Sequence, residues 1–238
     1  MTQKKAILYM IFSAIAFSLM GSVVKYLSTF NVYQVVFFRS VGTLLFTIPL
    51  IVKQKIPFWG DNKKWLIIRG IAGVVSLTLF FKSLNYLSIG TAVSLRYTAP
   101  IFAAILALFF LKEKIKPIQW LLFCIAFLGV LIIKGFGADI EFLGLFFVIF
   151  SAVFLGIIFV VIRKIGNTEH PLVIINYFML MAFTFGGLLS IKYWIRPNLI
   201  EWILFISTGV FGYFGQLYMT KAFQAEETNL VAPIKYLE

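Results

Sequence analysis

The sequence predicts an all-α integral membrane protein, and two observations carry that prediction. The chain of 238 residues is 61% hydrophobic and only 13% charged, whereas a soluble domain is about half apolar and about a quarter charged. A helix that spans a bilayer needs about 20 mostly apolar residues, and the chain offers a series of such runs. Runs such as IFAAILALFFL do not alternate between apolar and polar residues, which argues against a membrane-spanning barrel.

Eight apolar runs are long enough to be complete spans, and a ninth begins near residue 227 and is cut off at Glu238. The first run follows Lys4 and Lys5 and lacks a small-residue cleavage site, so we expect a span and not a removed signal peptide. The short connections leave no room for a soluble domain, and the single cysteine, Cys124, excludes an intrachain disulfide. The complete candidates are residues 6–27, 32–52, 64–86, 90–111, 117–134, 142–162, 172–192 and 200–222.

The basic residues predict a cytoplasmic N-terminus in the cell (inner) membrane. The net charge is +12, and most cations lie in the connections between spans. With the N-terminus inside, the inner connections carry eleven basic residues and the outer ones four, which is the bias that orients membrane proteins. This topology explains the charge without a nucleic-acid partner. Six further cations fall within the spans: Arg39, Arg69, Lys82, Arg96, Lys221 and Lys235.

A nearly constant offset in residue number relates two halves of the chain. The pairs at this offset, which agree to within one position, are Lys82 with Lys221, Arg96 with Lys235, Tyr97 with Tyr236, Gly70 with Gly209, Gly73 with Gly212, and Ser13 with Ser151. Because a unit of five spans is odd, the second copy would cross the membrane in the opposite sense, as in the inverted repeats of secondary transporters. We therefore expect repeats at residues 1–137 and 138–238. A complete protein would have ten spans, so we expect the sequence to be truncated within the ninth and less stable than the complete chain.

The end of the fourth predicted span carries a resemblance to a known family. The segment TAPIFAAILALFFLKEK closes that span, and Lys112, Glu113 and Lys114 stand where the family has a Gly-Glu-Lys/Arg-like turn. Residues 85–92 match the family's short link between its third and fourth helices. On these segments the chain resembles the EamA-type permeases of the drug/metabolite transporter superfamily over essentially its whole length. The resemblance implies transport driven by an ion gradient or by exchange, and the chain has no G-x-x-x-x-G-K-[ST] phosphate loop.

Arg96 and Pro100 form the first candidate site. Proline has no N–H, so the carbonyl four residues earlier, that of Arg96, loses its helical donor. That position lies roughly 9 Å from the end of the helix, and irregular backbone at such depth is tolerated where it lines a cavity or is buried in protein. Arg96 then either lines a cavity or snorkels outward from a packing kink. Pro233 affects the carbonyl of Asn229 in the same way in the ninth span.

Arg39 lies near the middle of the second span, where charges are rare and usually face a cavity or a partner. No carboxylate falls within the first four spans, so we expect a carbonyl, a tyrosine, a water or a substrate anion beside it. Lys82 and Lys221 lie near helix ends, where snorkelling is the default.

Neutral polar groups complete the predicted site. Asn176 and Gln216 lie inside the seventh and eighth spans, where each either binds substrate or holds helices together. Tyr97 and Tyr236 recur beside repeated cations and can stack on a planar substrate or receive a cation. The predicted substrate-binding residues are Arg39, Arg96, Tyr97, Asn176, Gln216, Lys235 and Tyr236.

The sequence favours a secondary active transporter, or permease, of small polar or amphiphilic metabolites, and the buried cations indicate an anionic group. A channel or a non-transporting membrane scaffold stays open as the alternative. A lipid-modifying enzyme would need clustered His, Asp and Glu, and the one histidine, His170, stands in a connection. We expect no cofactor, and we expect a small-molecule substrate and the lipid bilayer as partners, with a homodimer left open.

Overall fold

The computed structural model describes residues 3–114 and 141–237, together with residues 117, 118, 120, 121, 125 and 128. Its elements over these residues are all helical, and seven segments are long and apolar enough to cross a membrane. Large apolar side chains stay exposed on outer faces, as Leu8, Phe12 and Ile15 do along the first helix. Lipid tails are as apolar as these side chains, so such a surface suits the bilayer. The prediction of an all-α integral membrane protein is confirmed.

The spanning helices match seven of the eight predicted complete spans. They are α1 (Gln3–Tyr26), α2 (Val32–Lys53), α3 (Lys63–Ser83), α4 (Ile89–Arg96) followed by α5 (Ala99–Phe110), α7 (Phe142–Ile165), α8 (Pro171–Ser190) and α9 (Leu199–Ala225). The shorter elements are η1 (Gly166–Thr168), η2 (Ile191–Tyr193), α10 (Thr228–Val231) and η3 (Ala232–Leu237). The fifth predicted span, 117–134, falls mostly outside the described residues, as do Cys124 and Glu238.

Polar residues in the connections set the starts of several helices. The Asn31 side chain accepts the backbone N–H of Tyr33 at 2.9 Å before α2. Asn198 and Glu201 form a reciprocal capping box at the start of α9. Caps of this kind stabilise a helix by about 1 kcal/mol each, so the connections fix where these spans begin.

The fourth span is broken between α4 and α5, as Pro100 predicts. α4 ends at Arg96, and α5 begins at Ala99 with Pro100 in its first turn. The Thr98 hydroxyl donates to the Leu95 carbonyl at 2.7 Å, which provides a local donor at the break. The fourth span therefore consists of two shorter helices, α4 and α5.

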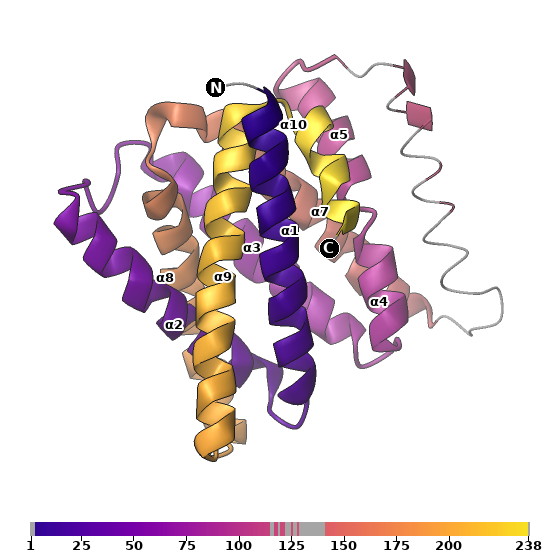
Figure 1. Cartoon of the computed structure of the whole chain (residues 1–238). Coiled ribbons are helices and arrows are strands. Elements are labelled where there is room, and N and C mark those ends of the chain that lie inside the picture. The colour runs from indigo at the N-terminus through magenta and orange to yellow at the C-terminus, as the bar shows by residue number, and fades with distance from the viewer. Residues whose placement is uncertain are drawn as a thin grey trace.

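Glycines let the helix backbones meet. α1 packs along α9 (Figure 1), α3 packs along α7, and α2 lies against α8 and α9. A β-carbon added at Gly42 of α2 would lie 2.7 Å from the Cα of Gly209 in α9, which is closer than real β-carbon contacts. Close approach of this kind is how helices associate in a bilayer. Gly42 and Gly209 therefore let α2 and α9 approach closely.

Candidate functional site

Two predicted cations share one aromatic ring in the interior of the bundle. The guanidinium carbon of Arg39 in α2 lies 5.9 Å from the ring centroid of Phe17 in α1. The Nζ of Lys235 in η3 lies 4.5 Å from the same centroid, and Lys235 is buried. A desolvated cation–π contact is worth up to about 2 kcal/mol. The fold thus joins the second predicted span to the ninth through Phe17.

Arg96-Tyr97 and its repeat counterpart Lys235-Tyr236 also lie together. The rings of Tyr97 and Tyr236 have centroids 6.3 Å apart. Arg96 lies with its guanidinium carbon 4.4 Å from the ring centroid of Phe80. Arg96, Tyr97, Lys235 and Tyr236 therefore occupy one region of the interior, built from the broken fourth span and from η3.

Arg69 is an interior cation that sequence reasoning misses as a site residue. It is 1% exposed, and its Nη2 donates to Oε1 of Gln216 in α9 at 3.0 Å. Its guanidinium carbon lies 4.5 Å from the ring centroid of Phe178 in α8. The predicted residue Gln216 thus binds a cation from α3. The one signal in the sequence is a charge inside an apolar run, which Arg69 shares with five other cations.

Asn176 lies on α8 facing α2. Its Oδ1 accepts the hydroxyl proton of Thr47 at 3.3 Å, and the residue is fully buried. Its Nδ2 has no hydrogen-bond partner within the described part of the chain. Asn176 therefore links two helices through its amide oxygen, and its role in substrate binding stays a prediction.

Lys82 and Lys221 occupy matching positions near helix ends. The Nζ of Lys82 lies 5.7 Å from the ring centroid of Phe147, and the Nζ of Lys221 lies 5.7 Å from that of Tyr9. Both lysines place the charged group over an aromatic ring of a neighbouring helix. A binding role is not needed to account for them.

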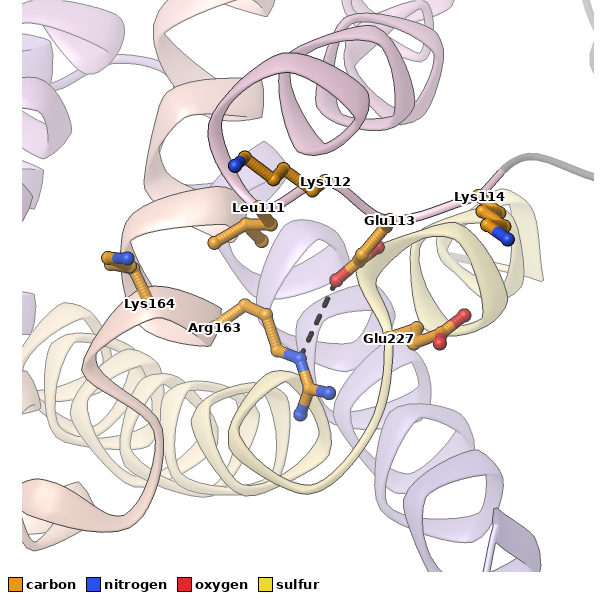
Figure 2. Close-up of a pocket in the computed structure, with 7 residues that line it drawn as sticks. All are labelled: Leu111, Lys112, Glu113, Lys114, Arg163, Lys164 and Glu227. Atoms are coloured by element: carbon orange, nitrogen blue, oxygen red, sulfur yellow. Dashed lines mark ion pairs between the residues drawn. The ribbon is translucent and has the colours of Figure 1, made fainter.

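A pocket of about 490 Å³ opens where α5 ends and α10 begins, a place we call the α5–α10 end. Figure 2 shows Glu113 directed toward Arg163 of α7, with Lys114 and Glu227 on one side of the pair and Lys164 on the other. The Glu113 carboxylate lies 3.6 Å from Nε of Arg163. Its two oxygens also accept the backbone N–H groups of Thr228 at 3.1 Å and Asn229 at 3.3 Å. Glu113 is 8% exposed, so a carboxylate just after α5 holds the start of α10.

Further hydrogen bonds extend from this pair across the same end of the bundle. Nη1 of Arg163 donates to the Gln224 carbonyl at 3.2 Å, and Nε2 of Gln224 donates to the Glu169 carbonyl at 2.8 Å. The Glu169 carboxylate accepts the backbone N–H of Asp61 at 2.8 Å and that of Asn62. Polar contacts thus run from the end of α5 through α7 and α9 to the α2–α3 connection.

A second pocket of about 440 Å³ lies near the start of α8. His170 lines it, and its Nδ1 accepts the N–H of Leu172 at 3.3 Å, as a helix cap. Partial burial, together with the positive charge of Lys221, lowers the pKa of His170 from its ordinary value of 6.5. Among the described residues, no group of three or more His, Cys, Asp or Glu could hold a metal ion. The residues that line this pocket are Tyr9, Asn167, Glu169, His170, Pro171, Lys221, Gln224 and Ala225.

Comparison with known families identifies the chain. The profile of the EamA-like transporter family matches residues 4–135, which is more than half of the sequence. The chain belongs to the EamA-like transporter family. The resemblance that the fourth span suggests is thereby confirmed, and this EamA-family protein is an integral membrane transporter of small metabolites.

Relatives and a solved structure agree with this membership. The pseudopaline exporter CntI of Pseudomonas aeruginosa is 29% identical and is aligned over 98% of this chain and 84% of its own. An S-adenosylmethionine uptake transporter of Rickettsia prowazekii is 24% identical over 100% of this chain and 81% of its own. A solved protein crystal structure that is 15% identical matches 99% of this chain and 86% of its own with a TM-score of 0.83. That likeness shows a shared fold. The two relatives are named for opposite directions of transport.

Proposed function

We propose that this EamA-family protein is a secondary active transporter that moves small polar or amphiphilic metabolites by alternating access. Two copies of one helical unit, at residues 1–137 and 138–238, would cross the membrane in opposite senses and rock against each other. The solute would bind between them and carry an anionic group. The N-terminus would be cytoplasmic in the inner membrane, because basic residues predominate in the connections on its side.

Equivalent residues make equivalent hydrogen bonds in the two halves, and this is the observation that carries the proposal. Ser13 of α1 donates its hydroxyl proton to the carbonyl of Gly215 in α9 at 2.9 Å. Ser151 of α7 donates to the carbonyl of Ser76 in α3 at 2.7 Å. Ser13 with Ser151, and Ser76 with Gly215, keep the offset of the repeat to within one position. An exchange of the halves therefore turns one hydrogen bond into the other.

The lysines and the helix pairs follow the same exchange. Lys82 lies over Phe147, and Lys221 lies over Tyr9; the two lysines, and the two rings, are again related by the offset of the repeat. α1 packs along α9 as α7 packs along α3. The helices α1, α3, α7 and α9 are thus related by one exchange of the halves. This supports an inverted repeat more strongly than the residue spacing alone.

The central cations would bind the solute. Arg39, Arg96 and Lys235 lie over interior rings, and Tyr97 and Tyr236 meet where the first half contacts the second. Asn176 and Gln216 would add hydrogen bonds from α8 and α9.

Glu113 would close one side of the transporter. Its carboxylate joins the end of α5 in the first half to the start of α10 and to Arg163 of the second half. In the proposed orientation this α5–α10 end faces the cytoplasm. Opening to that side would separate Glu113 from the N–H groups of Thr228 and Asn229, so its carboxylate is the proposed inner gate.

Transport in proteoliposomes tests the function. Purified protein would be reconstituted and screened with radiolabelled solutes, starting from S-adenosylmethionine because a relative is named for it. We expect saturable uptake that accelerates when the vesicles are preloaded with the same unlabelled solute. Flux that does not saturate would indicate a channel, and absence of flux for every solute would favour a scaffold. Unchanged uptake of all transported anions by Arg39→Ala and Arg96→Ala variants would refute the anionic site.

Serine variants test the inverted repeat independently of the solute. Ser13→Ala removes the hydrogen bond to the Gly215 carbonyl, and Ser151→Ala removes the equivalent bond to the Ser76 carbonyl together with a longer contact of 3.4 Å to the Ser76 hydroxyl. An interhelical hydrogen bond in a bilayer is worth about 0.6 kcal/mol. We expect similar losses in thermal midpoint. Ser22→Ala is the control, because the Ser22 hydroxyl bonds within its own helix, to the Ser18 carbonyl. A loss confined to Ser13→Ala would contradict equivalence of the halves.

A further inference from the structure

Arg69 carries a buried charge that its surroundings satisfy only in part. Its side chain is 1% exposed, and its Nη2 atom donates to Gln216. Its Nε and Nη1 atoms are buried and have no hydrogen-bond partner within the described part of the chain. An arginine always carries its charge and offers five N–H donors. Such a group inside a membrane is costly unless an anion or several acceptors face it.

The neighbours of Arg69 add positive charge and pack closely against its guanidinium. Arg39 lies close enough to repel Arg69 electrostatically. A β-carbon at Gly73 would lie 2.9 Å from Nη1 of Arg69, and one at Gly212 would lie 3.2 Å from Nε of Arg39. These glycines are a pair of the repeat, so each half keeps a glycine against a guanidinium. The one ion pair found among the described residues is Glu113 with Arg163, and it does not involve Arg69.

We propose that Arg69, supported by Gln216, is an oxyanion-binding site that receives a carboxylate or phosphate group. A guanidinium presents planar paired donors that match both groups. The Phe178 ring of α8 lies 4.5 Å from the guanidinium carbon of Arg69, and Gln216 of α9 accepts a hydrogen bond from Nη2. An anion here would also offset the repulsion between Arg69 and Arg39. This inference rests on the proposed transport function, since the group would belong to the transported solute.

The site is occluded in this conformation. Both unsatisfied nitrogen atoms are buried, so an anion would enter when α3 moves away from α8 or α9. In the proposed repeat α3 belongs to the first half and the other two helices to the second, and alternating access separates the halves. The anion would therefore bind to a conformation other than this one and shift the protein toward it.

Thermal unfolding of the purified protein tests the site without any transport measurement. Sodium citrate and sodium phosphate would be titrated at constant ionic strength against sodium chloride. We expect a saturable rise in thermal midpoint of several degrees, with the larger rise naming carboxylate or phosphate as the preferred group. Arg69→Gln should raise the half-saturating concentration at least tenfold. Lys82→Gln is the matched control, because Lys82 lies near a helix end over Phe147, and it should respond as the wild type does.

Gln216→Glu keeps Arg69 and supplies the absent carboxylate, so it remains informative if Arg69→Gln fails to fold. We expect this variant to unfold at a higher temperature than the wild type in chloride buffer and to lose most of its response to citrate and phosphate. An undiminished response in both variants would overturn the inference, as would a wild type that no oxyanion stabilises saturably. Anion binding without flux in proteoliposomes would instead refute the transport function and leave the site standing. Flux without an oxyanion response would refute only the site.

Discussion

Replacing Glu113 by alanine should open the α5–α10 end of the protein. The variant loses two hydrogen bonds from backbone N–H groups to a buried carboxylate, at 3.1 and 3.3 Å. Hydrogen bonds to charged groups contribute roughly 1.5–3 kcal/mol each, and these lengths favour the lower value. The contact with Arg163 adds little, because the Arg163 side chain is 28% exposed and solvent screens it. The closed state should lose about 3 kcal/mol, which raises the ratio of open to closed protein roughly 100-fold.

Alkylation of a buried position measures this ratio. Thr228 is fully buried and donates its N–H to Glu113, so a Thr228→Cys variant, made with Cys124→Ser, should react with a maleimide only after opening. Where closing is faster than alkylation, the rate follows the open population. We expect Glu113→Ala to accelerate labelling about 100-fold by that estimate. Glu113→Gln keeps one neutral acceptor and should have a smaller effect.

Glu227→Ala is the control for this experiment. Glu227 lines the same pocket but makes no side-chain cap hydrogen bond to α10. Its removal changes the local charge by the same amount and should leave the labelling rate within a few-fold of the parent. Equal acceleration in both variants would show that charge, and not the capping of α10, controls the rate. An unchanged rate in Glu113→Ala would refute the gate.

Two further variants test packing and acid sensitivity. Gly42→Ala should destabilise the protein by about 1–3 kcal/mol, because the new methyl group meets the backbone of Gly209; Gly21→Ala, which meets nothing within 4 Å, is the control, and equal midpoints for the two would contradict the close contact. His170 has a pKa below 6.5 in the folded protein, so as the pH falls below about 7 the unfolded chain gains its proton first and stability decreases. The effect should be small because His170 is exposed. The His170→Asn variant retains a capping acceptor, and its thermal midpoint should change less than that of the wild type between about pH 7.5 and 5.5.

The sequence predicts the spans well because their signal is local. A run of apolar residues is sufficient to place each helix, and Pro100 is sufficient to place the break between α4 and α5. Which helices pack against each other is harder to predict from the sequence. Gly209 indicates that some helix approaches closely, but its contact with Gly42 depends on how α2 and α9 cross.

The polar network at the α5–α10 end is beyond sequence reasoning for a different reason. Glu113 and Glu169 stand in short connections, where acids are usually solvated, yet they are 8% and 5% exposed. Apart from Arg163, the partners of these carboxylates are backbone N–H groups, which carry no residue-specific signal. Arg69 is similar, because its burial depends on Gln216 and Phe178 from helices far along the chain.

The gate and the oxyanion site should be coupled through the conformation that both require. In the structure the Glu113 carboxylate accepts the N–H groups of Thr228 and Asn229, and the Nε and Nη1 atoms of Arg69 are buried. If the anion binds only after opening, its apparent dissociation constant equals the intrinsic constant divided by the open fraction. Glu113→Ala should therefore lower the half-saturating concentration of citrate, by at most the roughly 100-fold gain in the open ratio. Glu113→Ala combined with Arg69→Gln should not regain citrate binding, since opening cannot replace the guanidinium. Unchanged or weaker citrate binding in Glu113→Ala would mean that the anion reaches Arg69 from the opposite side of the membrane, with the α5–α10 end closed.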